Sequence, residues 1–366
     1  MFLHANTDKA FKIVLTGFML LTALQGPVLL AAEDDRNSGE LITLRGVSHV
    51  HTTFSHDSNA TLKDVLDGLE QENLDFAVIT DHNSIAGQEM YQKMKGFTSM
   101  LIFANEISSP SGHLIALGVS EMPPKDASSQ ELVDWIHEKK GYAILAHPLS
   151  PREPWEDWEI KNWDGFEVYN FAHELYNQDA IGFGLSLYSE PEDTVLKTAQ
   201  YLSPESEKMW DDVLKIRPIS AIVGSNAHLK KNNKYFRVAV RSGVIYALVP
   251  DRSEAAVTRA LGQGRSYMAF ETRGRTEGFS FKAVSENTSY NIGDTVPYSP
   301  SGTALNVQVP EAAKIILIHK GDIIKNETSA EISFSAVDPG AYRVEVYKNN
   351  EIWIFTNPIY VGQKPA

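Results

Sequence analysis

Cysteine is absent from all 366 residues of the sequence. Its absence excludes disulfides, zinc–thiolate sites, cysteine nucleophiles and attachment of a lipid through a thiol. Any metal chemistry in this chain must therefore use imidazole, carboxylate, amide or water ligands.

Positive charge is also scarce. The chain has 33 Lys and Arg against 47 Asp and Glu, which gives a formal net charge of -14. A protein whose main partner is nucleic acid needs clustered Lys and Arg, so we expect no nucleic-acid partner. Hydrophobic residues make up 43% of the chain, which is enough to bury a core of ordinary size.

Long apolar runs are rare as well: the chain has one, at the N-terminus, and Lys9 and Lys12 precede it. This arrangement predicts an export signal over residues 1–32, a polar linker over 33–40, and a periplasmic or secreted protein. A leucine stands three positions before the expected cleavage site, where a small residue is usual, so an uncleaved N-terminal anchor is the alternative. No later segment is long and apolar enough to span a bilayer, so no other membrane contact is expected.

Between residues 41 and 276, short apolar runs alternate with amphipathic stretches. The spacing of Leu62, Val65, Leu66 and Leu69, for example, is that of one helix face. Such alternation is typical of repeated strand–helix units and predicts an α/β domain over 41–276. Strands are expected at residues 41–50, 76–80, 101–105, 114–118, 142–146, 166–169, 219–223 and 244–249.

The pattern changes over residues 277–366. Alternating apolar and polar residues are separated there by turn sequences such as Asp338-Pro339-Gly340. This pattern predicts a small all-β C-terminal domain, sandwich-like in architecture, whose default role is structural support.

His49 and His51 lie at the end of the first expected strand. Residues two apart on a strand point to the same side, so both imidazoles can reach one cation. Taken alone, the pair is explained as readily by packing or surface exposure as by metal binding.

Other potential ligands follow the later strands in a similar way. Asp57 comes six residues after His51, and Thr80-Asp81-His82 ends the second strand. The remaining ones, each near an end of an expected strand, are Glu106, His113, His147, Asn226 and His228. Because α/β barrels place their active sites at such strand ends, the set as a whole predicts one multinuclear metal site.

These segments resemble, in order, the motifs of the PHP (polymerase and histidinol phosphatase) family. They are His49 through Asp57, Thr80-Asp81-His82, Glu106 with Gly112-His113, Ala146-His147-Pro148, and Gly224 through His228. The resemblance covers residues 41 to about 275 and implies a distorted seven-stranded, TIM-like β/α barrel that holds two or three divalent ions, Zn, Mn or Fe. The exported barrel with its C-terminal tail is similar to the branch of carbaryl-hydrolase-like metallohydrolases.

The resemblance also implies a ligand set for each ion. The first ion would be bound by His49, His51, Glu106 and Asn226, the second by Asp57, His82 and His228, and the third by Glu106, His113 and His147. Glu106 would bridge two ions, which would hold the water that becomes the nucleophile. Asp81 would orient a ligand or carry a proton, although a helix cap explains it equally well.

Asn226 departs from the family pattern, which has Asp at this position. An amide oxygen can bind a metal ion, but it carries no charge and holds a hard cation less firmly. We therefore expect the first ion to be weakly held or missing, which would leave a two-metal site.

Three functions are compatible with these residues. Because phosphoesterases dominate the family, the first hypothesis is hydrolysis of a phosphate mono- or diester of a small molecule by a metal-bridging hydroxide. The second is hydrolysis of a carboxylic or carbamate ester, which needs the same ligands. The third, from another class, is a non-catalytic metal-binding barrel joined to a β module that binds carbohydrate or envelope. The near-complete ligand set speaks against the third, and Asn226 speaks for it.

Overall fold

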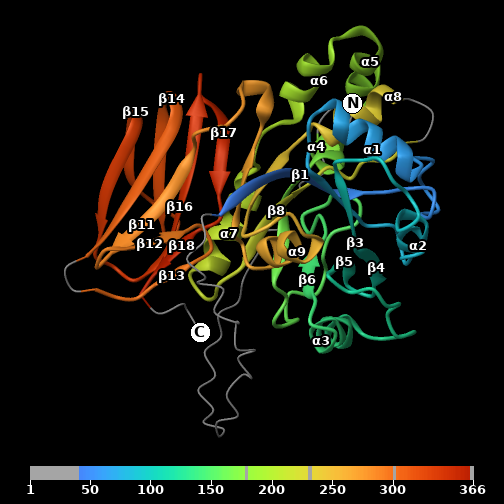
Figure 1. Ribbon diagram of the computed structural model, residues 1–366, viewed down its shortest axis with the longest axis horizontal. Helices are drawn as coiled ribbons and strands as arrows, with labels where there is room; N and C mark the ends of the chain where they lie inside the picture. Colours follow the sequence, from blue (N-terminus) through green and yellow to red (C-terminus); the bar gives the residue numbers. More distant parts are fainter. Residues whose placement is uncertain (1–40, 178–179, 230–232, 300–301, 363–366) are drawn as a thin grey trace, which may run out of the picture. The chain divides into compact units, whose positions relative to one another are not determined.

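The computed structural model describes residues 41–177, 180–229, 233–299 and 302–362 (Figure 1). The predicted signal and linker, residues 1–40, lie outside the described residues. Strands and helices alternate in the first part of the chain, as β1 (Ile42–Val50), α1 (Leu62–Gln71), β2 (Phe76–Ile79), α2 (Gly87–Tyr91), β3 (Met100–Phe103), β4 (Asn105–Ser109), β5 (Gly112–Leu117), α3 (Ser129–Glu138), β6 (Tyr142–Leu145), β7 (Gly165–Asn170), α4 (Phe171–Asn177), α5 (Ala180–Ser189), α6 (Glu192–Ala199), α7 (Pro204–Leu214), β8 (Ser220–Gly224), α8 (Asn233–Val240), β9 (Val244–Val249), α9 (Glu254–Gly262), β10 (Ser266–Ala269) and the short η1 (Glu271–Arg273). The rest consists of β11 (Ser280–Ser285), β12 (Thr288–Asn291), β13 (Thr295–Val296), β14 (Thr303–His319), β15 (Asp322–Ala336), β16 (Gly340–Lys348), β17 (Glu351–Thr356) and β18 (Ile359–Val361).

Local sequence explains where two of the helices begin. Helix α1 follows Thr61, whose hydroxyl accepts a hydrogen bond from the Asp64 amide while the Asp64 carboxylate accepts one from the Thr61 amide. Ser128 and Glu131 cap α3 in the same way. The buried face of α1 consists of the four residues that the spacing predicts, Leu62, Val65, Leu66 and Leu69. The helix is thus fixed at its start by the cap and along its length by the core.

The strands form two sheets, which confirms the mixed α/β prediction. A 13-stranded sheet follows the path β12-β11-β14-β16-β17-β10-β9-β1-β2-β3, with β13, β15 and β18 off this path. A five-stranded sheet has the order β4-β5-β6-β7-β8. The pairs β1–β2, β2–β3, β6–β7 and β7–β8 are parallel, whereas β5 is antiparallel to both β4 and β6.

The expected distorted seven-stranded barrel is not seen as a closed structure: the described ranges contain two open sheets. The sheets are joined at two short seams instead. In the first seam, residues 48–51 and 225–227 share three backbone hydrogen bonds of 2.9–3.1 Å. In the second, His82 and Glu106 form an isolated bridge. These two seams bring the ends of strands from both sheets together.

The backbone at the first seam explains why no full ladder forms there. His49 has a φ of 64° and Asn226 a φ of 45°, both in the left-handed region. A continuous β ladder needs extended residues, so the pairing between β1 and β8 cannot continue through these positions. Left-handed non-glycine residues cost free energy and are typical of functional sites.

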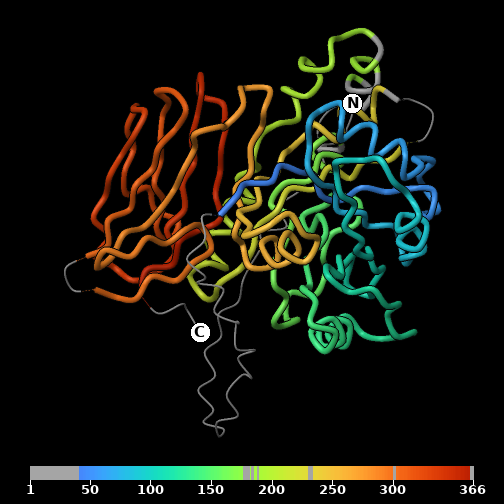
Figure 2. Tube along the Cα trace, in the orientation of Figure 1, coloured from blue at the N-terminus to red at the C-terminus, as the bar shows by residue number. Residues whose placement is uncertain are grey.

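The strand-rich C-terminal region is confirmed, and it continues the larger sheet. Strand β10 pairs with β17, which joins the C-terminal strands to β9 and β1, and the described residues form one compact unit (Figure 2). Asn357, just after β17, accepts a 2.8 Å hydrogen bond from the Ala221 amide and donates a 2.9 Å one to its carbonyl. The C-terminal region therefore anchors β8, the strand that leads to Asn226 and His228. In the described part of the chain, no helix has both the length and the apolar character needed to cross a membrane.

Candidate metal centre

The predicted ligands meet at the two seams. Strands β1, β2 and β8 end there and β4 begins there, while β5 and the residues after β6 add one histidine each. The carboxylate and imidazole residues of the prediction form one continuous set of contacts, made of His49, His51, Asp57, His82, Glu106, His113, His147 and His228. Residues up to 179 positions apart in the chain thus share one site, as expected if strand ends carry the chemistry.

The fully buried Glu106 carboxylate lies at the centre of this set. Its Oε1 atom is 2.8 Å from His113 Nδ1 and 3.0 Å from His147 Nε2. Its Oε2 atom is 3.1 Å from His49 Nε2, 3.2 Å from His51 Nε2 and 3.4 Å from His82 Nδ1. Five imidazoles around one carboxylate are the surroundings of a carboxylate that bridges cations.

Asp57 is the second acidic residue of the site. Its Oδ2 atom is 2.7 Å from His228 Nε2 and 3.5 Å from His82 Nε2, and Ser55 donates a 2.7 Å hydrogen bond to its Oδ1. Burial raises the pKa of Asp57, but the close contacts with the His228 and His82 rings outweigh burial and hold it below its ordinary value. The carboxylate is therefore charged and available to a cation.

Side-chain distances divide the site into groups that could each hold one ion. The groups are His51, Asp57, His82 and His228; His49, Glu106 and His147; His82, Glu106 and His113; and His113, His147 and Glu153. The resemblance implied a different division, in which His51 shares an ion with His49, whereas the distances group His51 with Asp57, His82 and His228. In both divisions Glu106 serves two ions.

The hydrogen bonds of His49 show why this site needs positive charge. Its Nδ1 atom is 2.7 Å from Glu167 Oε1, and since a carboxylate only accepts, Nδ1 carries the hydrogen. A neutral His49 would then turn the lone pair of Nε2 toward Glu106 Oε2. Burial opposes a charge on His49, but Glu167 and Glu106 outweigh burial and raise its pKa to about 10. A proton on Nε2 makes the contact with Glu106 Oε2 favourable, and a metal ion bound there would do so equally well.

His228 repeats this arrangement at the other end of the site. Its Nδ1 atom is 3.0 Å from the carbonyl oxygen of Asn226, which also only accepts, so Nδ1 carries the hydrogen. In a neutral His228, the lone pair of Nε2 would then face Asp57 Oδ2. Two lone pairs at this distance repel each other unless a cation lies beside them.

Unpaired buried atoms give an independent test of whether a metal fits. Among the described residues, five buried side-chain atoms of the site make no hydrogen bond: His51 Nε2, His82 Nδ1, His147 Nδ1, Asn226 Oδ1 and His228 Nε2. A buried polar atom without a partner costs roughly 1–3 kcal/mol, so such a concentration points to a ligand. Burial lowers the pKa of His51 to about 3 against the opposing effect of Glu106, which leaves its ring neutral and able to bind a metal. The donor set of imidazole nitrogens and carboxylate oxygens suits Zn, Mn or Fe.

Sequence reasoning missed Glu167, which orients two of the histidines. Besides its bond to His49, its Oε2 accepts 2.8 Å hydrogen bonds from the His147 amide and from Asn170 Nδ2. A Cβ atom at Gly224 would lie 2.1 Å from Glu167 Oε1, so glycine is required there. The available signal was a charged residue in the middle of an otherwise apolar strand, where burial demands a partner.

Asp81 lies beside the site, outside the ligand groups. Its two carboxylate oxygens accept hydrogen bonds from the Thr52 amide, at 2.6 Å, and from the Thr52 hydroxyl, at 2.7 Å. Burial raises the pKa of Asp81 against the opposing effect of these bonds. Its contacts are those of a residue that positions the turn after His51.

Asn226 lies between β8 and His228 and contacts Asn170 at 3.5 Å through its Nδ2 atom. This contact leaves Oδ1, the only atom of the side chain that can bind a metal, without a hydrogen bond among the described residues. The amide oxygen is thus available to a ligand.

A cavity of about 520 Å³ adjoins the metal centre. Part of its lining consists of His147, which belongs to the centre, and of Glu167 and Asn170, which are hydrogen-bonded to residues of the centre. The rest of the lining is Leu149, Ser150, Val168, His173, Glu174, Tyr201, Ser203, Pro204, Glu205 and Ser206. The cavity has the size of a small-molecule site.

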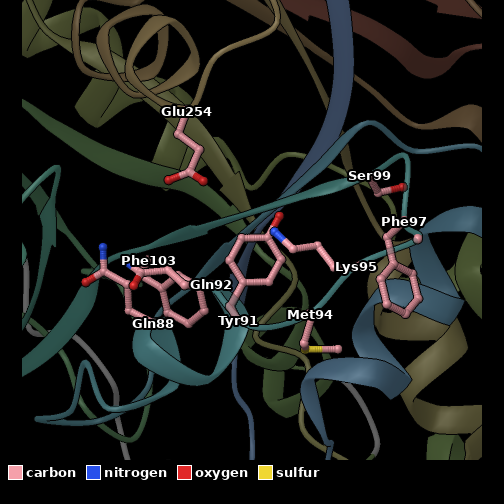
Figure 3. A pocket seen from close by; sticks show the side chains of 10 residues that line it. Gln88, Tyr91, Gln92, Met94, Lys95, Phe97, Ser99, Phe103 and Glu254 are labelled. Carbon is pink, nitrogen blue, oxygen red and sulfur yellow. The ribbon is translucent and has the colours of Figure 1, made fainter.

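A second cavity, of about 330 Å³, lies among α2, the loop after it, β3 and α9. Figure 3 shows its aromatic residues Tyr91, Phe97 and Phe103, with Glu254 on α9. None of the residues around it belongs to the metal centre. Of these two cavities, the one of 520 Å³ adjoins the centre.

Comparison with solved structures gives only low similarity. A two-domain protein of Bacteroides vulgatus that contains a predicted PHP-like metal-dependent phosphoesterase matches with a TM-score of 0.46 and 14% identity, over 87% of this chain and 96% of that one. PsfC of Pseudomonas syringae matches with a TM-score of 0.39 and 11% identity, over 62% and 91%. An amidohydrolase of Chromobacterium violaceum matches with a TM-score of 0.31 and 13% identity, over 50% and 88%. Similarity at this level carries no argument about fold or reaction.

Sequence comparison is more informative. No family model matches the chain. The uncharacterized protein MJ1587 of Methanocaldococcus jannaschii is 30% identical over 152 residues, which cover 38% of this chain and 86% of that protein. The chain belongs to the same family as this archaeal protein.

Proposed function

We propose that this protein is an exported, metal-dependent hydrolase of the PHP type and that its substrate is a phosphate ester of a small molecule. One observation carries the proposal: the buried Glu106 carboxylate lies within 3.4 Å of five imidazole nitrogens. When bound, divalent ions at such a site acidify water and neutralise the charge that builds up on the ester oxygens.

The chain's own residues prepare the site for this chemistry. Glu167 keeps the hydrogen of His49 on Nδ1, which leaves Nε2 free to bind a metal. Ser55 donates to Asp57 and also accepts a 3.2 Å hydrogen bond from the His82 amide, so it fixes two ligands at once. Asp81 holds Thr52 and thereby the turn that leads from His51 to Asp57. The ligands are therefore oriented before any metal binds, which lowers the cost of binding.

A second candidate, hydrolysis of a carboxylic or carbamate ester, is favoured by one observation. Among the residues that the structure describes, no Lys or Arg lines the cavity beside the centre. A phosphate ester would then rely on metal ions alone to balance its charge, whereas an uncharged ester has no such need.

A substrate panel separates the two candidates. Protein loaded with Mn or Zn is assayed with p-nitrophenyl phosphate, bis-p-nitrophenyl phosphate and p-nitrophenyl acetate. We expect turnover of at least one phosphate ester and its loss in His49→Ala and with a chelator. His137→Asn is the matched control, because His137 pairs with Asp164 outside the centre. Turnover of the acetate alone would replace the first candidate by the second, and no turnover at all would contradict both.

A further inference from the structure

The loop after β6 brings one more acidic residue, Glu153, to the metal centre. Its Oε2 atom is 3.9 Å from His113 Nδ1. Ligand atoms of Glu153, His113 and His147 all lie within 4.8 Å of one another, which is close enough for the three residues to share an ion. Glu153 is not among the ligands that the sequence predicts, so its place beside two of them is a separate observation.

Local sequence restricts the backbone around Glu153. The buried Ser150 hydroxyl accepts a 2.9 Å hydrogen bond from the Glu153 amide. Pro151 stands two residues before Glu153 and Pro154 one residue after it, and each proline ring fixes its own φ angle. The loop therefore has few conformations to lose when Glu153 binds an ion.

The end of the loop is attached to the strand that carries His113. The Trp155 side chain is buried, and a Cβ atom at Gly112 would lie 2.9 Å from its ring, so this ring packs against the backbone next to His113. The Glu156 amide donates a 2.8 Å hydrogen bond to the Ser111 carbonyl oxygen. These contacts hold the loop beside the His113 ring.

Two carboxylates approach the same nitrogen of His113. Its Nδ1 atom is 2.8 Å from Glu106 Oε1 and 3.9 Å from Glu153 Oε2, and Glu106 Oε1 is also 3.0 Å from His147 Nε2. A ring nitrogen carries at most one hydrogen, so it cannot satisfy both carboxylates. Two atoms bound to one Zn ion can be up to about 4.2 Å apart, and all three distances lie within this limit.

His147 points to a ligand independently. The residue is 4% exposed, and its Nδ1 atom has no hydrogen-bond partner among the described residues. A buried nitrogen without a partner is rare in folded proteins and is typical of a site that binds an ion.

We infer that Glu153 is a further ligand of the divalent ion that His113 and His147 share. This inference rests on the proposed function, because it assumes a divalent ion at this centre, but it does not depend on which ester is hydrolysed. Together with Glu106, Glu153 supplies two negative charges, which balance the charge of the ion.

Metal binding tests this inference without any need for turnover. The affinity of metal-free, full-length protein for Zn is measured by competition with a fluorescent chelator. We expect Glu153→Gln to weaken the binding of one ion per chain by about 10-fold or more. Glu156→Gln is the matched control and should leave the affinity unchanged, because it removes the same charge from the same loop and belongs to no ligand group of the described residues. The Glu153 side chain is 63% exposed, so its amide variant should fold.

A double variant shows whether Glu153 acts on the same ion as His113. His113→Ala should already weaken this ion, so adding Glu153→Gln should cause little further loss. The effect of Glu153→Gln should also persist at about 1 M salt, where the Debye length of ~3 Å suppresses the effect of a charge that does not touch the ion.

Three results would overturn the inference and leave the proposed function standing. They are equal affinities of Glu153→Gln and Glu156→Gln, additive losses in the double variant, and an effect of Glu153→Gln that disappears at high salt. A wild-type protein that binds no Zn would contradict the proposed function and the inference with it.

Discussion

Two buried polar clusters in this protein differ in how their charges are paired. In the metal centre, one carboxylate, Glu106, is surrounded by imidazoles, and several buried nitrogens have no hydrogen-bond partner in the described structure. In the second cluster, between α7 and β16, the buried Arg343 guanidinium binds both oxygens of Asp211 at 2.7 and 2.8 Å, pairs with Glu345 and stacks on the Trp210 ring. The protein alone satisfies Arg343, whereas it leaves the surroundings of Glu106 incomplete.

This difference indicates which of the two clusters binds a ligand. A buried polar group that the protein satisfies holds elements together, as Arg343 holds α7 against the C-terminal strands. A buried polar group without a hydrogen-bond partner lowers the stability of the fold, and only a bound ligand can restore that stability. Variants that change one cluster at a time show whether metal binding and the stability of the fold can be lost separately.

The largest effect is expected for Glu106→Gln. The amide is the same size but cannot bridge two cations, so activity should fall by about 10³-fold or more, equivalent to ~4 kcal/mol. The midpoint of thermal unfolding of the metal-free protein should fall modestly, because the variant leaves His49 with Glu167 as its remaining acidic partner. Initial rates and calorimetry on matched samples measure both quantities. Glu345→Gln is the control from the other cluster, and retained activity in Glu106→Gln would contradict the assignment.

Arg343→Met should lower the stability of the fold and leave metal binding unchanged. It leaves Asp211 and Glu345 without their cation, which should lower the free energy of unfolding by about 3–5 kcal/mol. The number of metal ions per chain should stay the same. Urea denaturation measures stability, with Lys325→Met on β15 as a surface control. A loss of bound metal without a loss of stability would show that the two clusters are not separate.

Glu167→Gln tests the orientation of the metal ligands. The amide can donate to His49 Nδ1 as well as accept from it, so His49 is no longer held with Nε2 free for a metal. We expect metal affinity to fall by about 10- to 100-fold. Competition with a fluorescent chelator measures the affinity. An unchanged affinity would mean that packing alone orients His49.

Glu207 on α7 makes the second cluster sensitive to pH. Burial and the nearby Glu345 raise the pKa of Glu207 to about 7. The folded state therefore holds a proton that the unfolded chain has lost, so the free energy of unfolding should fall as pH rises from about 4.5 to about 7 and level off above it. One pKa unit is ~1.4 kcal/mol, and partial exposure reduces the total fall to roughly 1–3 kcal/mol.

Urea denaturation of the wild type and Glu207→Gln across this range isolates the effect. The Gln side chain stays neutral, so the stability of the variant relative to the wild type should rise with pH. A constant difference would show that Glu207 titrates normally. Metal content should not change in either case.

The smallest change is expected for Asn226→Asp. A charged oxygen at this position should tighten binding of the most weakly held ion by about 10-fold. Titration of the metal-free variant with Mn measures the gain. If both proteins bind a full complement equally tightly, Asn226 is not the reason for a weak site.

Much of the site could be predicted because its signals are local. Histidines and acids directly follow apolar strand sequences, and strand ends of an α/β fold meet in space, so His49, His82 and His228 could be placed together without coordinates. The capping boxes and the buried face of α1 follow from patterns a few residues long. Such features depend on spacing and not on the arrangement of the whole chain.

Other features depend on pairing between residues far apart in the chain and could not be predicted from the sequence. The first seam remains open because the backbone is left-handed at His49 and Asn226, a conformation that the residue type alone does not fix. The bond between Glu167 and His49 joins residues 118 positions apart, and the clusters built by Arg343 join α7 to a strand far along the chain. The larger sheet continues from β10 into β17, and this pairing also joins segments that are far apart in the chain.

The most direct test of the central claim is the metal content of the purified protein. Wild type and Glu106→Gln are dialysed against metal-free buffer and measured by inductively coupled plasma mass spectrometry. The account predicts about two or three divalent ions per chain in the wild type and the loss of at least one in the variant. A wild-type protein that binds no divalent ion, even after incubation with Zn, Mn or Fe, would contradict it.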